Sequence, residues 1–186
     1  MKRIVVLLFT VASLALASSA VFSHAARPSC QFQYLLGTGF LCSLPNTPNP
    51  CPDIAKAADG DRIELAGQGT FDVNARSVTG GGDFTHRNAG GTVLASGTWS
   101  AKQFITFQDY GNGTPQGLPE NTEGGRFVLR VHVSPAGGGS GHDAILQVNC
   151  QLGTPPAGTE EGFTLAIQDA INFNKKVSGV TVFVRQ

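Results

Sequence analysis

The chain has 186 residues with 13 basic and 13 acidic side chains, so its formal net charge is zero, and only 14% of its residues are charged. An average globular domain has about 25% charged residues. Without a basic excess the chain has little with which to neutralise phosphates, which argues against nucleic-acid binding. A hydrophobic content of 41% argues against a disordered chain, and the length suits one domain with its own core.

The first 25 residues are predicted to be a secretory signal peptide. Lys2 and Arg3 form a positive start, an uncharged apolar run follows over residues 4–22, and the small residues Ser23 and Ala25 precede the predicted cleavage point. A membrane anchor is the alternative, because an apolar run of about 20 residues can span a bilayer. No basic stop-transfer segment follows, so cleavage is favoured. This predicts a secreted, extracellular protein that has no membrane contact after cleavage.

Residues 26–58 are predicted to be an irregular, Pro-rich and cysteine-containing lead-in. Four prolines fall within a short stretch and exclude a helix or a central strand there. They are Pro45, Pro48, Pro50 and Pro52. Residues 53–58 make one helical turn at most, and residues 59–186 are predicted to form a single β domain.

The four cysteines are disulfide candidates. They are Cys30, Cys42, Cys51 and Cys150. An even number of cysteines in an exported protein predicts pairing. Three connectivities are open, but if all four cysteines pair, Cys150 must bond to one of the three in the lead-in. Because Cys150 falls on the apolar side of its expected strand, a buried free thiol is the alternative.

From residue 59 onwards, apolar and polar residues alternate as they do in half-buried β-strands. The main expected strands cover residues 62–65, 70–74, 83–86, 92–107, 126–133, 144–152, 163–173 and 180–184. Glycine-rich turns separate many of them. The predicted fold class is all-β: an antiparallel barrel or sandwich of about eight strands, with the irregular lead-in tied to it by a disulfide.

Residues 163–173 could form a helix or a strand, but their alternation favours a strand. The apolar residues of one parity are Phe163, Leu165, Ile167, Ile171 and Phe173. Asp169 shares this parity and breaks the pattern, because a buried carboxylate needs a partner or a raised pKa. One hypothesis makes Asp169 a polar anchor in a barrel cavity, with Arg130 and His132 as the other candidate ligand-binding residues. The alternatives are a bulge that turns Asp169 to solvent, or an ion pair with Arg126 or Arg130.

Catalytic and metal-binding constellations are missing from the sequence. The histidines outside the predicted signal peptide are His86, His132 and His142. They are not spaced as metal ligands. The carboxylate pairs Glu120/Glu123 and Glu160/Glu161 could serve a glycosidase, but both lie in Pro/Gly-rich segments where acidic side chains are usually solvated. We therefore expect no catalytic residues, no metal and no cofactor.

Five stretches of the chain carry a resemblance to other proteins. They are GQGTF (67–71), SVTGGGDFTH (77–86), SGTW (96–99), DAILQV (143–148) and PPAG (155–158). Over roughly residues 59–184, the chain resembles a set of secreted microbial β-proteins without a known activity, so the resemblance implies an exported β-protein and transfers no activity. The glycine-punctuated strands are also similar, at the level of fold, to the eight-stranded barrels of the dirigent and allene oxide cyclase type, which take small apolar ligands.

The sequence favours a secreted binding protein over an enzyme. The first hypothesis is a non-catalytic β module that binds a ligand, a glycan or another protein. The alternative is a barrel that carries or isomerises a small apolar molecule, and it depends on Asp169 and the barrel-like strand count. The identity of the partner and the oligomeric state stay open.

Overall fold

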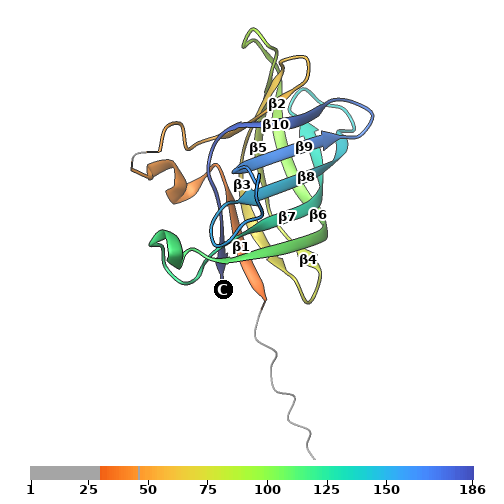
Figure 1. Cartoon of the computed structure of the whole chain (residues 1–186). Helices are drawn as coiled ribbons and strands as arrows, with labels where there is room; N and C mark the ends of the chain where they lie inside the picture. The colour runs from red at the N-terminus through yellow and green to blue at the C-terminus, as the bar shows by residue number, and fades with distance from the viewer. Residues whose placement is uncertain (1–29, 46) are drawn as a thin grey trace, which may run out of the picture.

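The computed structural model describes residues 30–45 and 47–186, and its strands form one antiparallel sheet that closes in a ring (Figure 1). Strands account for 59% of the described residues and helices for 5%. The all-β prediction is confirmed, and the closed ring makes the fold a barrel. The predicted signal peptide lies outside the described residues.

Eleven strands and two short 3-10 helices follow one another along the described part of the chain. They are β1 (Gln31–Leu36), η1 (Gly39–Ser43), β2 (Asp53–Ala57), β3 (Arg62–Asp72), β4 (Ser77–Val78), β5 (Gly81–Arg87), β6 (Val93–Asn112), η2 (Thr114–Gln116), β7 (Thr122–Pro135), β8 (His142–Cys150), β9 (Gly162–Ile167), β10 (Asn172–Ser178) and β11 (Thr181–Arg185).

The long strands β3 and β7 change neighbours along their length. β3 pairs with β2 over residues 62–65 and with β1 over residues 67–72. β7 pairs with β11 at residues 122–123 and with β8 over residues 125–133. Because β1 and β2 follow one another along β3, they make one interrupted ribbon, and β10 and β11 make another beside it. Leaving out the two-residue β4, the ring has eight ribbons, which agrees with the predicted number.

Residues 37–45 and 47–52 leave the sheet between β1 and β2, and this segment is termed the 37–52 loop. The loop contains η1 and a disulfide between Cys42 and Cys51, whose Cα atoms are 5.2 Å apart. A disulfide in the N-terminal region is therefore confirmed. The irregular segment is narrower than the predicted 26–58, because both flanks are strands of the ring. In particular, residues 53–57 form β2 and not a helical turn.

The predicted bridge from Cys150 to the N-terminal segment is wrong. Within the described residues Cys30 and Cys150 are free thiols, and Cys150 is buried at 1% exposure. Its inward parity on β8 was read correctly, so the alternative of a buried thiol holds. Cys42 and Cys51 are separated by only 9 positions, and closing so short a loop restricts the chain less than closing one across the whole domain.

Residues 163–173 form a hairpin and not the predicted continuous strand. β9 ends at Ile167, and the backbone N–H of Ile167 donates to the carbonyl of Ile171 across the turn. Asp169 lies in this turn with φ of 56°, in the left-handed region that Asp tolerates better than most residues. Because Ile167 and Ile171 are four positions apart, the hairpin keeps the parity of a single strand, and the alternation could not reveal it.

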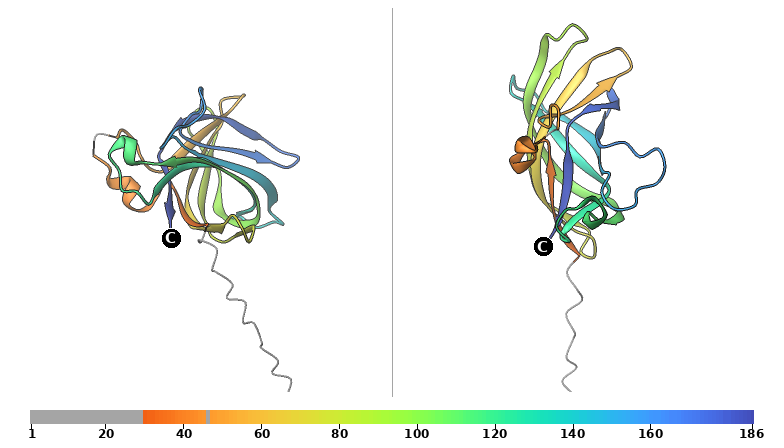
Figure 2. Two further views of the ribbon diagram at one scale, coloured as in Figure 1. Left: turned by 60° about the horizontal axis from the view of Figure 1, so that its bottom comes forward. Right: turned by 60° about the vertical axis from the view of Figure 1, so that its left-hand side comes forward.

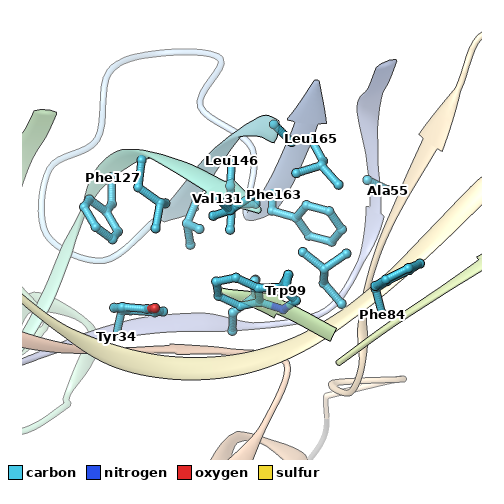
Figure 3. Close-up of a cluster of buried hydrophobic side chains, with 14 of the residues drawn as sticks. Tyr34, Ala55, Phe84, Trp99, Phe127, Val131, Leu146, Phe163 and Leu165 are labelled. Carbon is cyan, nitrogen blue, oxygen red and sulfur yellow. The ribbon is translucent and has the colours of Figure 1, made fainter. Parts of the chain in front are cut away.

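Side chains from opposite walls fill the interior of the ring. Figure 3 shows Trp99 on one wall facing Phe163 and Leu146 on the other. Towards the other end, the rings of Phe71 and Phe127 stack with centroids 4.2 Å apart. Phe163, Leu165 and Phe173, which share the apolar parity, are buried, and so is Trp99, while Ile167 and Ile171 are partly buried at the margin of the core.

Glycines make room for the largest of these side chains. A Cβ added at Gly67 would lie 2.3 Å from the Trp99 ring. The Trp99 indole N–H donates to the carbonyl of Ala66 at 3.3 Å, so its polar atom is satisfied inside the core. The glycine-rich strands thus let a bulky core pack close to the backbone.

Candidate functional site

The predicted ligand-binding residues Asp169, Arg130 and His132 lie on the outside of the barrel. Arg130 and His132 alternate with buried residues of β7 and point outward, and Asp169 is exposed in the β9–β10 turn. Arg130 and Asp169 line an open hollow of about 510 Å³, together with Asp143, the partner of His132. The three residues do gather on one face, but the hypothesis of an interior anchor at Asp169 is wrong. Asp169 does face solvent, but through a hairpin turn and not through the bulge that the alternative supposed.

His132 is held by two acceptors at the edge of this hollow. Its Nδ1 lies 2.9 Å from Asp143 Oδ1, and its Nε2 lies 3.1 Å from the carbonyl oxygen of Ser140. Both contacts are hydrogen bonds when each ring nitrogen carries a proton. The hydrogen bond from His132 lowers the pKa of Asp143. Because both ring nitrogens are engaged, the pair ties the β7–β8 hairpin to its loop and leaves His132 no free atom for a ligand.

A second pocket, termed the apolar pocket, has a volume of about 460 Å³ and lies against the outer side of β11. Its apolar lining comes from the 37–52 loop, from the segment around η2, from the residues that follow β8 and from Val180 and β11. These lining residues are Phe40, Leu41, Leu44, Leu118, Pro119, Leu152, Val180 and Val182. In Figure 2, η1 and η2 project from the same side of the barrel. A pocket of this size suits a small molecule.

The 37–52 loop forms one wall because its aliphatic residues cover the outside of β1 and β11. Leu41 packs with Leu35 and Val182 in a second, small hydrophobic cluster outside the ring. Phe40 is left 55% exposed at the mouth. The disulfide closes this loop on itself and so adds a covalent restraint to its packing against the sheet.

The segment around η2 forms the opposite wall and is fixed by polar contacts. The side-chain oxygen of Asn112 accepts hydrogen bonds from the backbone N–H and the hydroxyl of Thr114. Further along, the Gln116 amide exchanges two hydrogen bonds with the backbone of Gly153. These contacts present Leu118, which is 40% exposed, to the pocket.

The polar floor of the apolar pocket is built around Glu161. Its carboxyl accepts hydrogen bonds from the backbone N–H of Gln151 at 2.7 Å and of Thr181 at 2.8 Å. The Thr181 hydroxyl lies 2.7 Å from Glu161 Oε1 and 2.6 Å from the carbonyl oxygen of Asn149. Burial raises the pKa of Glu161. The buried thiol of Cys150 completes the floor, and burial raises its pKa as well.

Behind this floor lies Asp53, the first residue of β2, with 0% exposure. Neither of its carboxyl oxygens has a hydrogen-bond partner among the described residues. Burial, and then the charge of Glu161, raises the pKa of Asp53 to about 8. The Val180 N–H and the charge of Lys176 oppose this shift, although the Val180 N–H does not complete a hydrogen bond. Asp53 is therefore a buried acid that the fold does not neutralise with a direct partner.

Two of the four glutamates expected to be solvated are not. Glu120 and Glu160 are exposed, as predicted. Glu123, however, is 3% exposed at the start of β7, and Glu161 is partly buried and hydrogen-bonded. Each of these two directly precedes a glycine that begins or extends a strand. The glutamate therefore lies in or next to the barrel wall, where neighbouring strands cover it. That position was the sequence signal that could have found them.

Within residues 30–45 and 47–186, no group of three or more His, Cys, Asp or Glu side chains could hold a metal ion. The same part of the chain contains no helix long and apolar enough to cross a membrane. Comparisons with protein families, with curated proteins and with solved structures find no match to this chain.

Proposed function

We propose that the protein is an exported, non-catalytic binding module that takes a small, largely aliphatic molecule in the apolar pocket. The observation that carries this proposal is the pocket itself: an apolar hollow of about 460 Å³ with a polar floor at Glu161 and Thr181. Sites for small molecules combine an apolar lining with a few placed polar groups. The apolar walls would hold the body of the ligand and the floor would orient its polar end.

Export is part of the proposal and is supported by two features. The leader at residues 1–25 has the charge and hydrophobic pattern of a signal peptide. The disulfide between Cys42 and Cys51 is compatible with an oxidising compartment.

The pocket favours carrying a ligand over isomerising it. An isomerase needs a group that gives or takes a proton at the ligand. Glu161 is the carboxyl that lines the pocket, and its oxygens already accept from Gln151 and Thr181. The interior of the ring is filled by the aromatic core, so the ligand is placed outside the ring and not along its axis.

The proposal is tested with the uncharged fluorescent probe N-phenyl-1-naphthylamine. A ligand that removes about 200 Å² of apolar surface from water gains about 5 kcal/mol. That gain alone corresponds to a dissociation constant of about 0.2 mM, and the entropy of association weakens binding further, so a dissociation constant on the order of millimolar is expected. Leu118→Asp should weaken binding at least about tenfold, because a carboxylate would have to be desolvated in the wall.

Ile145→Asp is the matched control, because Ile145 is 40% exposed and lines the other hollow, beside Arg130. It should leave binding of the probe unchanged. Loss of binding in Ile145→Asp with none in Leu118→Asp would move the site to that hollow. Absence of binding in the unmodified protein would contradict the proposed function.

A further inference from the structure

The buried carboxyl of Asp53 packs against Gly179, the residue that directly precedes the Val180–Val182 wall of the apolar pocket. A Cβ added at Gly179 would lie 1.9 Å from Asp53 Oδ1, so the carboxyl occupies the space where a side chain would otherwise be. Gly179 is followed by Val180, Thr181 and Val182, which line the pocket. The backbone carbonyl of Val180 also accepts from the N–H of Gly37 at 3.1 Å, which ties the start of the 37–52 loop to the same point.

The charged groups near Asp53 do not neutralise its carboxylate. Glu161, ahead of β9, is itself acidic, and Lys176 on β10 acts on Asp53 only through space. The Lys176 ammonium donates instead to the carbonyl of Glu160, and lies 2.8 Å from the Asn149 side-chain oxygen when that amide is oriented to accept. On β3, the residue opposite Asp53 is the uncharged Leu65. An ionised Asp53 would thus be a buried charge without a hydrogen bond, which is strongly unfavourable.

We propose that Asp53 is a proton-controlled support of the apolar pocket: while it is neutral the Gly179–Val182 wall stays closed over it, and when it ionises the wall is displaced and the ligand is released. This inference rests on the proposed function. Ionisation requires water or a donor to reach the carboxyl, and the seam between Asp53 and Gly179 is where the packing must open. Because a carboxyl ionises as the pH rises, the ligand is released at alkaline pH.

The direction of the pH dependence follows from the raised pKa of Asp53, about 8. A carboxyl whose pKa is higher in the folded than in the unfolded chain, where it is about 4, favours the fold most below pH 4, and this contribution is lost as the pH rises through 8. If only the neutral form is competent, the apparent dissociation constant for the probe should rise about tenfold between pH 6.5 and pH 9.

The experiment compares the unmodified protein with Asp53→Asn and with Asp83→Asn, an exposed aspartate of β5. N-phenyl-1-naphthylamine binding is measured at pH 6.5 and pH 9 for each protein, and the melting temperature is followed over the same range without probe. We expect the dissociation constant to rise about tenfold in the unmodified protein and in Asp83→Asn. It should change less than twofold in Asp53→Asn, because an amide cannot ionise.

An equal rise in Asp53→Asn would overturn the proposal. If Asp53→Asn does not fold, the titration of Asp53 is followed in the unmodified protein by carboxyl carbon NMR. A midpoint well above 4 favours the proposed role of Asp53, and a midpoint at or below 4 refutes that role. If the probe does not bind at pH 6.5, the proposed function fails, and the coupling to the pocket fails with it. The melting curves would then still show, independently, whether Asp53 folds as a neutral acid.

Discussion

Asp53 and Glu123 are both carboxyls buried beside β11, and the fold treats them in opposite ways. Glu123 Oε1 accepts from Arg185 Nε at 2.8 Å and from Nη2 at 2.7 Å, and the guanidinium lies over the Phe32 ring at 5.0 Å. Asp53 has no such cation and its pKa rises. The hydrogen bond with Glu123 instead raises the pKa of Arg185. An arginine that reaches a buried carboxylate offsets part of the cost of burying its charge, and where no cation makes contact, burial favours the neutral acid.

Gly179→Ala, which acts at Asp53, should lower the stability of the fold more than the other substitutions. The new Cβ would meet the Asp53 carboxyl, and the φ of 119° disfavours any residue with a side chain. Overpacking and backbone strain together are expected to destabilise the protein by about 3–5 kcal/mol, measured by urea denaturation. The control is Gly91→Ala, where φ is 89° but no atom lies within 4 Å of the added Cβ. It should cost only about 1–2 kcal/mol, and equal losses in both variants would remove Asp53 from the explanation.

Arg185→Ala should remove the ion pair with Glu123 and lower the free energy of unfolding by about 3 kcal/mol. The substitution leaves Glu123, whose side chain is 4% exposed, with a charge and no partner. Adding Glu123→Gln to this variant should restore part of the stability, since the amide carries no charge to desolvate. The measurement is the urea midpoint of the single and double variants at pH 7. If Glu123→Gln destabilises the Arg185→Ala variant further, an unpaired charge on Glu123 is not the cause of the lost stability.

Replacing both Cys42 and Cys51 with Ala should loosen the 37–52 loop, which leads into Asp53, and leave the barrel core unchanged. Opening a loop of this length is expected to cost about 2 kcal/mol. Probe binding in the apolar pocket should weaken, because Phe40 and Leu41 lose their fixed placement, while the near-ultraviolet circular dichroism of Trp99 in the core stays the same. A changed Trp99 signal would show that the loop supports the barrel as well as the pocket.

Asp143→Asn should have the smallest effect, because this carboxylate is solvent-exposed even though His132 donates to it. Exposed pairs contribute little, so the urea midpoint at pH 7 should not change measurably. The lowered pKa of Asp143 places what contribution it has above the unfolded pKa of about 4, and this contribution is lost as the pH falls. A clear loss at pH 7 would mean that exposure does not separate this carboxylate from the buried pair.

The alternation of apolar residues predicted most of the barrel because each strand buries one face. The parity of Phe163, Leu165, Phe173 and Cys150 was correct. The alternation did not reveal the turn at Asp169, because that turn preserves the parity of a continuous strand. It also did not reveal that Cys42 pairs with Cys51, its neighbour in the chain, and not with Cys150. The apolar pocket could not be predicted, because its walls come from separate loops that meet only when the ring closes.

The pairing of β1 with β11 joins the first described strand to the last, with Phe32 opposite Arg185. A chain synthesised from its N-terminus cannot complete this ring until β11 has been made, and pairing across so long a separation is slow. The order of synthesis therefore delays closure of the ring until β11 is available. A protein proposed to cross a membrane before it folds would benefit from this delay, and truncation within Thr181–Arg185 would leave β1 without the strand that closes the ring.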